Sequence, residues 1–185
     1  MRSASRIPGL AMMAAGFLLL LGSTRADEKP VVVKIGGLKA TAPAEWKSEK
    51  PKYTLRSYQF KLPGKDGTDA ELTVYPESNP NPEKSFPRWK ATFNPPEGKT
   101  VEDISQVRTF EIPGAKVTLL DVSGTWRFKE APQDPKSKEM ILEDYRVVWV
   151  IVAEKEEATH LRLSGPKATV DRHYPAFEKW LKSLK

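Results

Sequence analysis

Residues 145–153 have the sequence Tyr-Arg-Val-Val-Trp-Val-Ile-Val-Ala, a run dominated by β-branched and aromatic side chains. Side chains alternate between the two faces of a strand, so Tyr145, Val147, Trp149 and Ile151 share one face. The intervening valines fall on the other face. A strand that is apolar on both faces is typical of the middle of a sheet covered on both sides. The stretch therefore predicts a central strand with helices over both faces of its sheet.

Hairpins surround this strand in the sequence. Short alternating or β-branched runs are separated by glycine, proline and aspartate residues of the kind found in turns. The predicted strands cover residues 31–35, 38–42, 55–62, 70–75, 107–112, 116–122, 124–128 and 159–164. Residues 129–139 are charged and contain two prolines, and they are predicted to form a mobile loop.

Two segments are predicted to be helical. Asn81 and Pro82 suit the cap and first position of a helix, and Phe86, Trp89 and Phe93 would give that helix one apolar stripe. The C-terminal segment has apolar residues at helical spacing, with Thr169 or Ser164 as its expected cap and Pro175 as an expected kink or start. Its stripe consists of Val170, Tyr174, Phe177, Leu181 and Leu184.

The first 26 residues have the layout of a secretory signal peptide. Arg2 and Arg6 precede an apolar stretch, and Thr24-Arg25-Ala26 offers small residues for a signal peptidase. The stretch is shorter than the roughly 20 apolar residues that span a bilayer, although an uncleaved anchor is the alternative. Cleavage would remove three arginines and lower the formal net charge from +6 to +3. We therefore expect an exported protein, periplasmic or secreted, with no stable membrane insertion after cleavage.

The remaining residues, 27–185, have the length of a single domain. The order of elements is strands, a short helix, more strands and a final helix. This order predicts an α+β fold with a central antiparallel sheet flanked by helices and a C-terminal amphipathic helix packed on the sheet. The chain has no cysteine, so its stability must come from packing and not from disulfides.

Two segments resemble PsbP-like domains of exported bacterial proteins of unknown function. Residues 37–46 read Gly-Leu-Lys-Ala-Thr-Ala-Pro-Ala-Glu-Trp, and residues 165–184 begin Gly-Pro and end Trp-Leu-Lys-Ser-Leu. The chain departs from the pattern at Leu38, where an aromatic residue is common, and at Glu45, where a glycine is common. The resemblance implies an α/β/α sandwich and an accessory or binding role. It supplies no catalytic residues.

No motif with established chemistry is present in the sequence. The absence of cysteine and the presence of only two histidines exclude a thiolate zinc site and a three-histidine site within one chain. Neither a Gly-x-Ser-x-Gly elbow nor a glycine-rich phosphate-binding loop occurs. We therefore predict no catalytic, cofactor-binding or metal-binding residues and expect no cofactor. The position of any binding site is not predicted.

Three sets of residues were candidates for chemistry, each with a simpler interpretation. Asp66, Asp69 and Glu71 suit calcium in residue type, but their spacing is more typical of a turn. His160 could act as a base, but it is interpreted as an exposed or hydrogen-bonded strand residue. His173 is predicted to lie on a solvated helix face.

The five tryptophans could include a stacking platform for sugars or bases. Trp89 and Trp149 are predicted to lie in the core by their periodicity. Trp46 and Trp126 are less constrained, although packing is the favoured interpretation for both. A common open groove for these two residues would favour ligand binding.

The leading hypothesis is a non-catalytic binding or accessory protein of the cell envelope. The mild positive charge does not suggest nucleic acid, so the expected partner is a protein or a small molecule. One alternative is a hydrolase or other enzyme with dispersed residues such as His160 and Arg162. It would require His160 in a deep cleft facing two carboxylates. A purely structural envelope protein is the other alternative.

Overall fold

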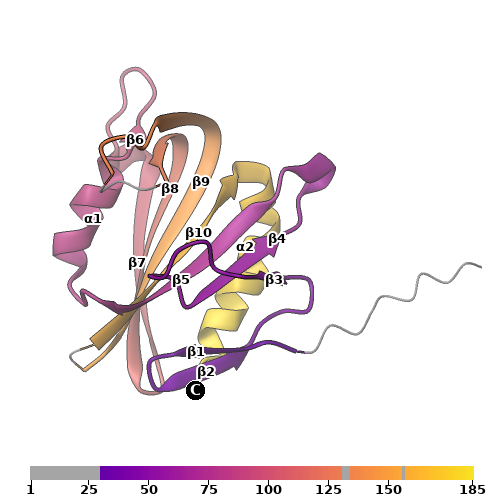
Figure 1. Ribbon diagram of the computed structural model, residues 1–185. Coiled ribbons are helices and arrows are strands. Elements are labelled where there is room, and N and C mark those ends of the chain that lie inside the picture. The colour runs from indigo at the N-terminus through magenta and orange to yellow at the C-terminus, as the bar shows by residue number, and fades with distance from the viewer. Residues whose placement is uncertain (1–29, 131–133, 156) are drawn as a thin grey trace, which may run out of the picture.

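The computed structural model describes residues 30–130, 134–155 and 157–185 (Figure 1). The predicted leader and residues 131–133 of the predicted mobile loop lie outside the described residues. Within them, no helix combines the length and apolar character needed to cross a membrane. The described part of the chain is mostly antiparallel sheet, with two α-helices, one of which is C-terminal.

One eight-stranded sheet dominates the molecule. Its order is β3-β4-β5-β10-β9-β8, and both β6 and β7 pair with β8 at the far edge. Strand β9 lies between β10 and β8, so the prediction of an interior strand is confirmed. The strands are β3 (Lys47–Glu49), β4 (Tyr58–Leu62), β5 (Ala70–Ser78), β6 (Phe93–Asn94), β7 (Ser105–Ile112), β8 (Ala115–Lys129), β9 (Glu139–Glu154) and β10 (Glu157–Pro166).

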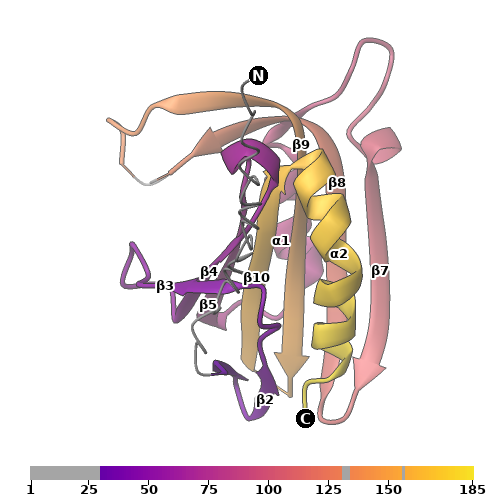
Figure 2. The same ribbon diagram turned by 90° about the vertical axis from the view of Figure 1, so that its right-hand side faces the viewer.

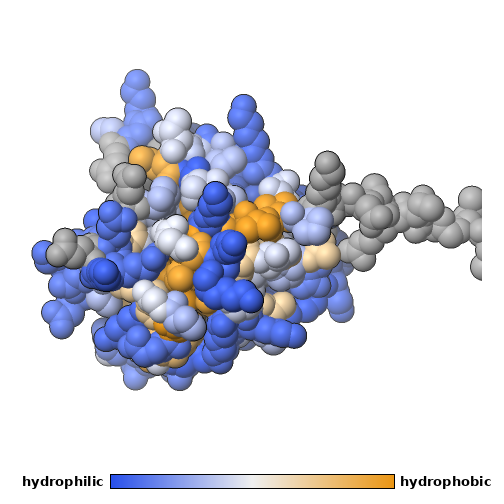
Figure 3. All heavy atoms as spheres, turned by 90° about the horizontal axis from the view of Figure 1, so that it is seen from below, coloured by the Kyte–Doolittle hydropathy of each residue, from blue (hydrophilic) through white to orange (hydrophobic). Residues whose placement is uncertain are grey.

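The first predicted hairpin forms a separate two-stranded sheet from β1 (Val32–Ile35) and β2 (Leu38–Thr41). Gly36 turns the chain with a φ of 56°, a value that glycine adopts at little cost. Backbone hydrogen bonds of 3.0 and 3.2 Å join Lys39 to Lys185, so the hairpin is tied to the C-terminus. The end of the molecule that carries this hairpin is mainly hydrophilic, with a band of apolar surface between hydrophilic side chains (Figure 3).

Helices α1 (Pro82–Lys90) and α2 (Lys167–Lys182) lie on opposite sides of the strands β8 to β10 (Figures 1 and 2). Two short 3-10 helices, η1 (Lys65–Gly67) and η2 (Glu102–Ile104), occur in loops. The α1 side contains one apolar cluster and the α2 side a larger one. Because α1 has only nine residues, it covers only part of its face, and the predicted flanking by helices is met only in part.

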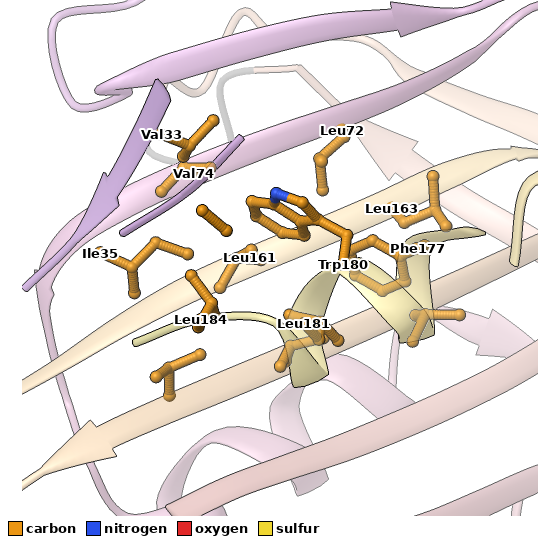
Figure 4. Packing of buried hydrophobic residues seen from close by; sticks show 14 of the residues in the cluster. Val33, Ile35, Leu72, Val74, Leu161, Leu163, Phe177, Trp180, Leu181 and Leu184 are labelled. Atoms are coloured by element: carbon orange, nitrogen blue, oxygen red, sulfur yellow. The ribbon is translucent and has the colours of Figure 1, made fainter. Parts of the chain in front are cut away.

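The larger cluster lies between α2 and the sheet (Figure 4). All members of the predicted C-terminal stripe are in this cluster or packed against it. Trp46 is also part of the cluster, with its ring 5.3 Å from that of Trp180 and 5.9 Å from that of Phe60. These rings meet edge to face, an arrangement that favours aromatic pairs. The C-terminal helix therefore completes the core.

Several predicted boundaries of the helices are wrong. Helix α1 ends at Lys90, so Phe93 reaches the same apolar cluster from strand β6 and not from the helix. Helix α2 begins at Lys167 and has no side-chain cap; the Thr169 hydroxyl instead donates to the carbonyl oxygen of Thr68 at 2.7 Å. Pro175 lies inside this helix and does not mark its start. Burial of the apolar stripe outweighs these local signals.

Predicted strands also differ from those observed. Strand β4 begins at Tyr58, and Leu55, which was predicted to belong to it, is 77% exposed. The short edge strand β3 was not predicted, because its residues are polar and lack alternation. The runs 116–122 and 124–128 belong to one strand, β8, although Gly124 suggested a break between them.

The pairing of β8 with β9 contains a bulge near Gly124. Gly124 pairs with Tyr145 and Trp126 pairs with Leu142, so β9 has one more residue than β8 between these pairs. A bulge bends the strands and increases their local twist. Beyond it, residues 125–129 and 139–143 form an extension, here called the arm, which bends over the end of the sheet (Figure 2).

Asp144 occupies the bulge with a φ of 50°, in the left-handed region. Asp144→Val should lower the free energy of unfolding by about 1–2 kcal/mol, because a β-branched side chain fits this region poorly. Urea denaturation measures the change. Glu143→Val is the control, since Glu143 is also exposed and has no positive φ. Equal losses in the two variants would contradict the assigned role of Asp144.

Candidate functional site

The face of the sheet that carries α1 contains a groove of about 640 Å³. Helix α1, strands β5, β9 and β10 and the arm all contribute to its walls. A volume of this size is typical of sites for small organic ligands. The lining consists of Leu55, Tyr75, Ser78, Arg88, Trp89, Ala91, Thr92, Trp126, Arg127, Phe128, Lys129, Glu139, Trp149, His160, Leu161 and Arg162.

Stacked aromatic rings form one part of the groove. Trp89 of α1 lies parallel to Trp149 of β9, with 5.5 Å between ring centroids and 11° between planes. The His160 ring meets Trp89 edge to face at 5.1 Å. Helix α1 is thus fixed to the sheet by aromatic contacts, and the same rings line the groove. The core prediction for Trp89 and Trp149 is confirmed, since both belong to or pack against the smaller cluster.

The arm supplies a second aromatic part. Trp126 and Phe128 alternate on β8, with ring centroids 4.7 Å apart. The indole N–H of Trp126 donates to the hydroxyl of Thr92 at 3.0 Å, which ties the arm to the segment after α1. The guanidinium carbon of Arg162, on β10, lies 5.5 Å from the centroid of each of these rings. This is the range of cation–π contacts.

This contact shows how far the arm bends. Arg162 is in register with Trp149 and, through it, with Leu120 of β8. Phe128 lies eight residues beyond Leu120, which is about 26 Å along a straight strand. Arg162 nevertheless contacts the Phe128 ring. The bulge therefore folds the arm back over β10, where the arm forms one wall of the groove.

Positive groups dominate the charged residues of the groove. Four cationic side chains line it, and Glu139 is the one carboxylate among the described lining residues. Arg127 donates a hydrogen bond to the carbonyl oxygen of Ala91, while its buried Nε has no partner among the described atoms. Arg162 is the one cation of the set with an ion pair to a described carboxylate, at 3.4 Å from Glu71. The other three cations are Arg88, Arg127 and Lys129.

A smaller hollow of about 220 Å³ adjoins the groove and shares Trp126, Phe128 and Arg162 with it. Arg56, whose side chain is only 5% exposed, lines this hollow and pairs with Glu71 at 3.4 Å. Glu71 is therefore shared between two guanidinium groups. Asp69 also lines the hollow, but it is paired with Lys61 at 2.7 Å.

The candidate acidic loop is not assembled into a metal site. Asp69 accepts a hydrogen bond from the Gly64 backbone at 2.7 Å in addition to its ion pair, and Glu71 faces arginines. Asp66 is exposed in the 3-10 helix η1. No group of three or more histidine, aspartate and glutamate side chains suited to a metal ion occurs among the described residues.

His160 faces the groove beside Arg162, as its strand position predicts, and its Nε2 lies 2.7 Å from the carbonyl oxygen of Asn79. This agrees with a hydrogen-bonded strand histidine. The groove offers it one carboxylate, Glu139, where the enzyme alternative required two. His173 does not lie on a solvated face, and that prediction is wrong. It is buried, with Nε2 at 2.9 Å from the Pro63 carbonyl oxygen.

Trp46 and Trp126 do not share a groove. Trp46 is buried in the α2 cluster, whereas Trp126 is in the α1 cluster and lines the groove. The packing interpretation is confirmed for both. Neither the partnership of Trp126 with Trp89 and Trp149 nor the contribution of Phe128 to the groove was predicted from the sequence. The alternation of Trp126 and Phe128 was the one available signal, because nothing local indicates where the arm bends.

No protein-family model and no curated protein matches the chain. Among solved structures, a cyanobacterial PsbP from Synechocystis has a TM-score of 0.47 and 12% identity, covering 89% of this chain and 98% of its own. A Pseudomonas aeruginosa protein of unknown function has a TM-score of 0.41 and 14% identity, covering 85% of this chain and 97% of its own. A Bacteroides thetaiotaomicron protein has a TM-score of 0.39 and 11% identity, covering 80% of this chain and 44% of its own. Similarity at this level carries no argument about function.

The His160 ring should titrate below about pH 6.5, the ordinary value for histidine. Burial is the largest effect and lowers the pKa of His160, and the charge of Arg88 lowers it further. The hydrogen bond to the Asn79 backbone acts in the opposite direction and raises the pKa. The pKa of His160 is lower in the folded protein than in the unfolded chain, so protonation of the ring destabilises the fold. The contribution of neutral His160 to the free energy of unfolding is therefore complete above about pH 6.5 and is lost as the pH falls through the folded pKa.

An NMR titration of the histidine ring protons measures this shift, with His160→Gln to assign the signal. The same variant should show a weaker dependence of the unfolding free energy on pH below about 6.5. A His160 signal that titrates at or above this pH would contradict the burial described here.

Proposed function

We propose that the chain is a non-catalytic, exported PsbP-like domain that binds a small molecule or a partner segment in the aromatic groove as an accessory protein of the cell envelope. The signal-peptide layout supports export, and the two sequence motifs support the PsbP-like sandwich. One observation carries the binding role: three tryptophans, Trp89, Trp126 and Trp149, line a groove that remains open although a helix and an arm lie over it.

The arrangement favours binding over catalysis. Aromatic rings offer broad apolar contact with few rotatable bonds, so they bind ligands at a low cost in entropy. A catalytic site requires titratable groups that converge on a reacting atom. In the groove, His160 faces a backbone carbonyl group, Arg127 contacts a carbonyl group, and Arg162 contacts aromatic rings and Glu71. These contacts hold the walls in place and suit a preformed binding surface.

The tryptophans provide an internal test of this role. Three of the five line the groove, whereas Trp46 and Trp180 pack in the opposite core. Protein isolated from its native envelope is screened by NMR against a library of small aromatic, alkyl and peptide compounds. Binders should shift the three indole N–H signals of the groove and leave the other two unchanged. Mass spectrometry should recover every bound compound intact.

A matched pair of variants locates the site. Phe128→Ala should weaken binding of any hit by about fivefold, since a lost aromatic contact is worth about 1 kcal/mol. Phe110→Ala is the control, because Phe110 is also half-buried on a strand but packs against the opposite core. Conversion of a bound compound into product would contradict the proposal. So would a screen with no binder, or binders that shift only Trp46 and Trp180.

A further inference from the structure

We infer that the occupant of the groove is an amphiphilic anion, with an elongated apolar body and one anionic head group such as a carboxylate. This inference rests on the proposed binding function and adds the class of ligand. It follows from two independent features of the groove, the excess of positive charge and the extension of the apolar lining onto the surrounding surface.

The charge of the groove is not balanced by the protein. Arg88, Arg127 and Lys129 make no ion pair with any carboxylate in the described ranges, and Glu139 is the one acidic lining residue there. The adjoining hollow adds no excess of either sign, because its described lining has three cationic and three acidic residues. Cations in a cavity with apolar walls attract an anion more strongly than they would in open water.

Arg127 is the residue best placed to hold the head group. It lies at half-buried depth, and unlike Arg162 it has no carboxylate partner among the described residues. A guanidinium group without a counter-ion beside apolar walls favours an anion supplied by a ligand. Arg88 and Lys129 are exposed and would strengthen the local positive field. A charge-assisted hydrogen bond of this kind is stronger than one between neutral groups.

The remainder of the ligand must be apolar. Trp126, Phe128 and Trp149 present their rings to the groove. Leu55, which also lines it, is 77% exposed, and Met140 of the arm, which lines the adjoining hollow, is 44% exposed. Large apolar side chains left in water beside a groove mark a surface that another molecule covers. An alkyl chain can follow such a surface from the groove to its rim, whereas a small polar anion would leave it uncovered.

The test compares three probes of equal chain length, decanoate, decanol and decyltrimethylammonium, by calorimetry with protein produced from the full-length chain. Decanoate should bind about tenfold more tightly than decanol, and the cation should bind most weakly. Arg127→Gln should remove the preference for decanoate over decanol. Arg88→Gln, at an exposed position, provides a second variant that should reduce the preference without disturbing packing.

Lys116→Gln is the matched control, because Lys116 is an exposed cation on the same strand β8 outside the groove. It should leave the binding of all three probes unchanged. Equal affinities for the three probes, or tighter binding of the cation, would overturn the inference and leave the proposed binding function in place. Failure of all three to bind, together with a library screen without hits, would overturn both.

Discussion

The apolar character of both faces of β9 is the constraint on which the rest of the structure depends. Val148 and Val150 belong to one cluster, whereas Val147 and Trp149 belong to the other. A strand of this kind cannot leave either face in water. The chain covers the first face with the whole length of α2 and covers the second with a short helix and a folded arm.

The incomplete cover of the second face produces the groove. Helix α1 is fixed by the stacking of Trp89 on Trp149, and the arm is fixed by Trp126 and by the contact of Phe128 with Arg162. Space remains between these two covers, and it is lined by the rings that hold them in place. The same aromatic side chains therefore serve packing and provide a surface for a ligand, so the two interpretations of the tryptophans are compatible.

The sequence predicted those elements in which burial follows a regular period. The central strand and the C-terminal helix are present because alternation or helical spacing marks each buried side chain. The groove could not be predicted, because it depends on the bulge at Asp144, where a residue other than glycine adopts a positive φ. Gly124 suggested a break between two strands, whereas strand β8 continues through it and bends. His173 was predicted to lie on a solvated helix face, because its partner, the Pro63 carbonyl group, is 110 residues away in the sequence.

The position of the arm is the central claim, and a nuclear Overhauser measurement tests it directly. With the arm folded over β10, the ring protons of Phe128 should show cross-peaks to the side-chain protons of Arg162, since the guanidinium carbon lies 5.5 Å from the ring centroid. A straight arm would place Phe128 about 26 Å beyond the register position of Arg162 and give no cross-peak. Absence of these cross-peaks in the folded protein would contradict the groove formed by the arm and the binding role derived from it.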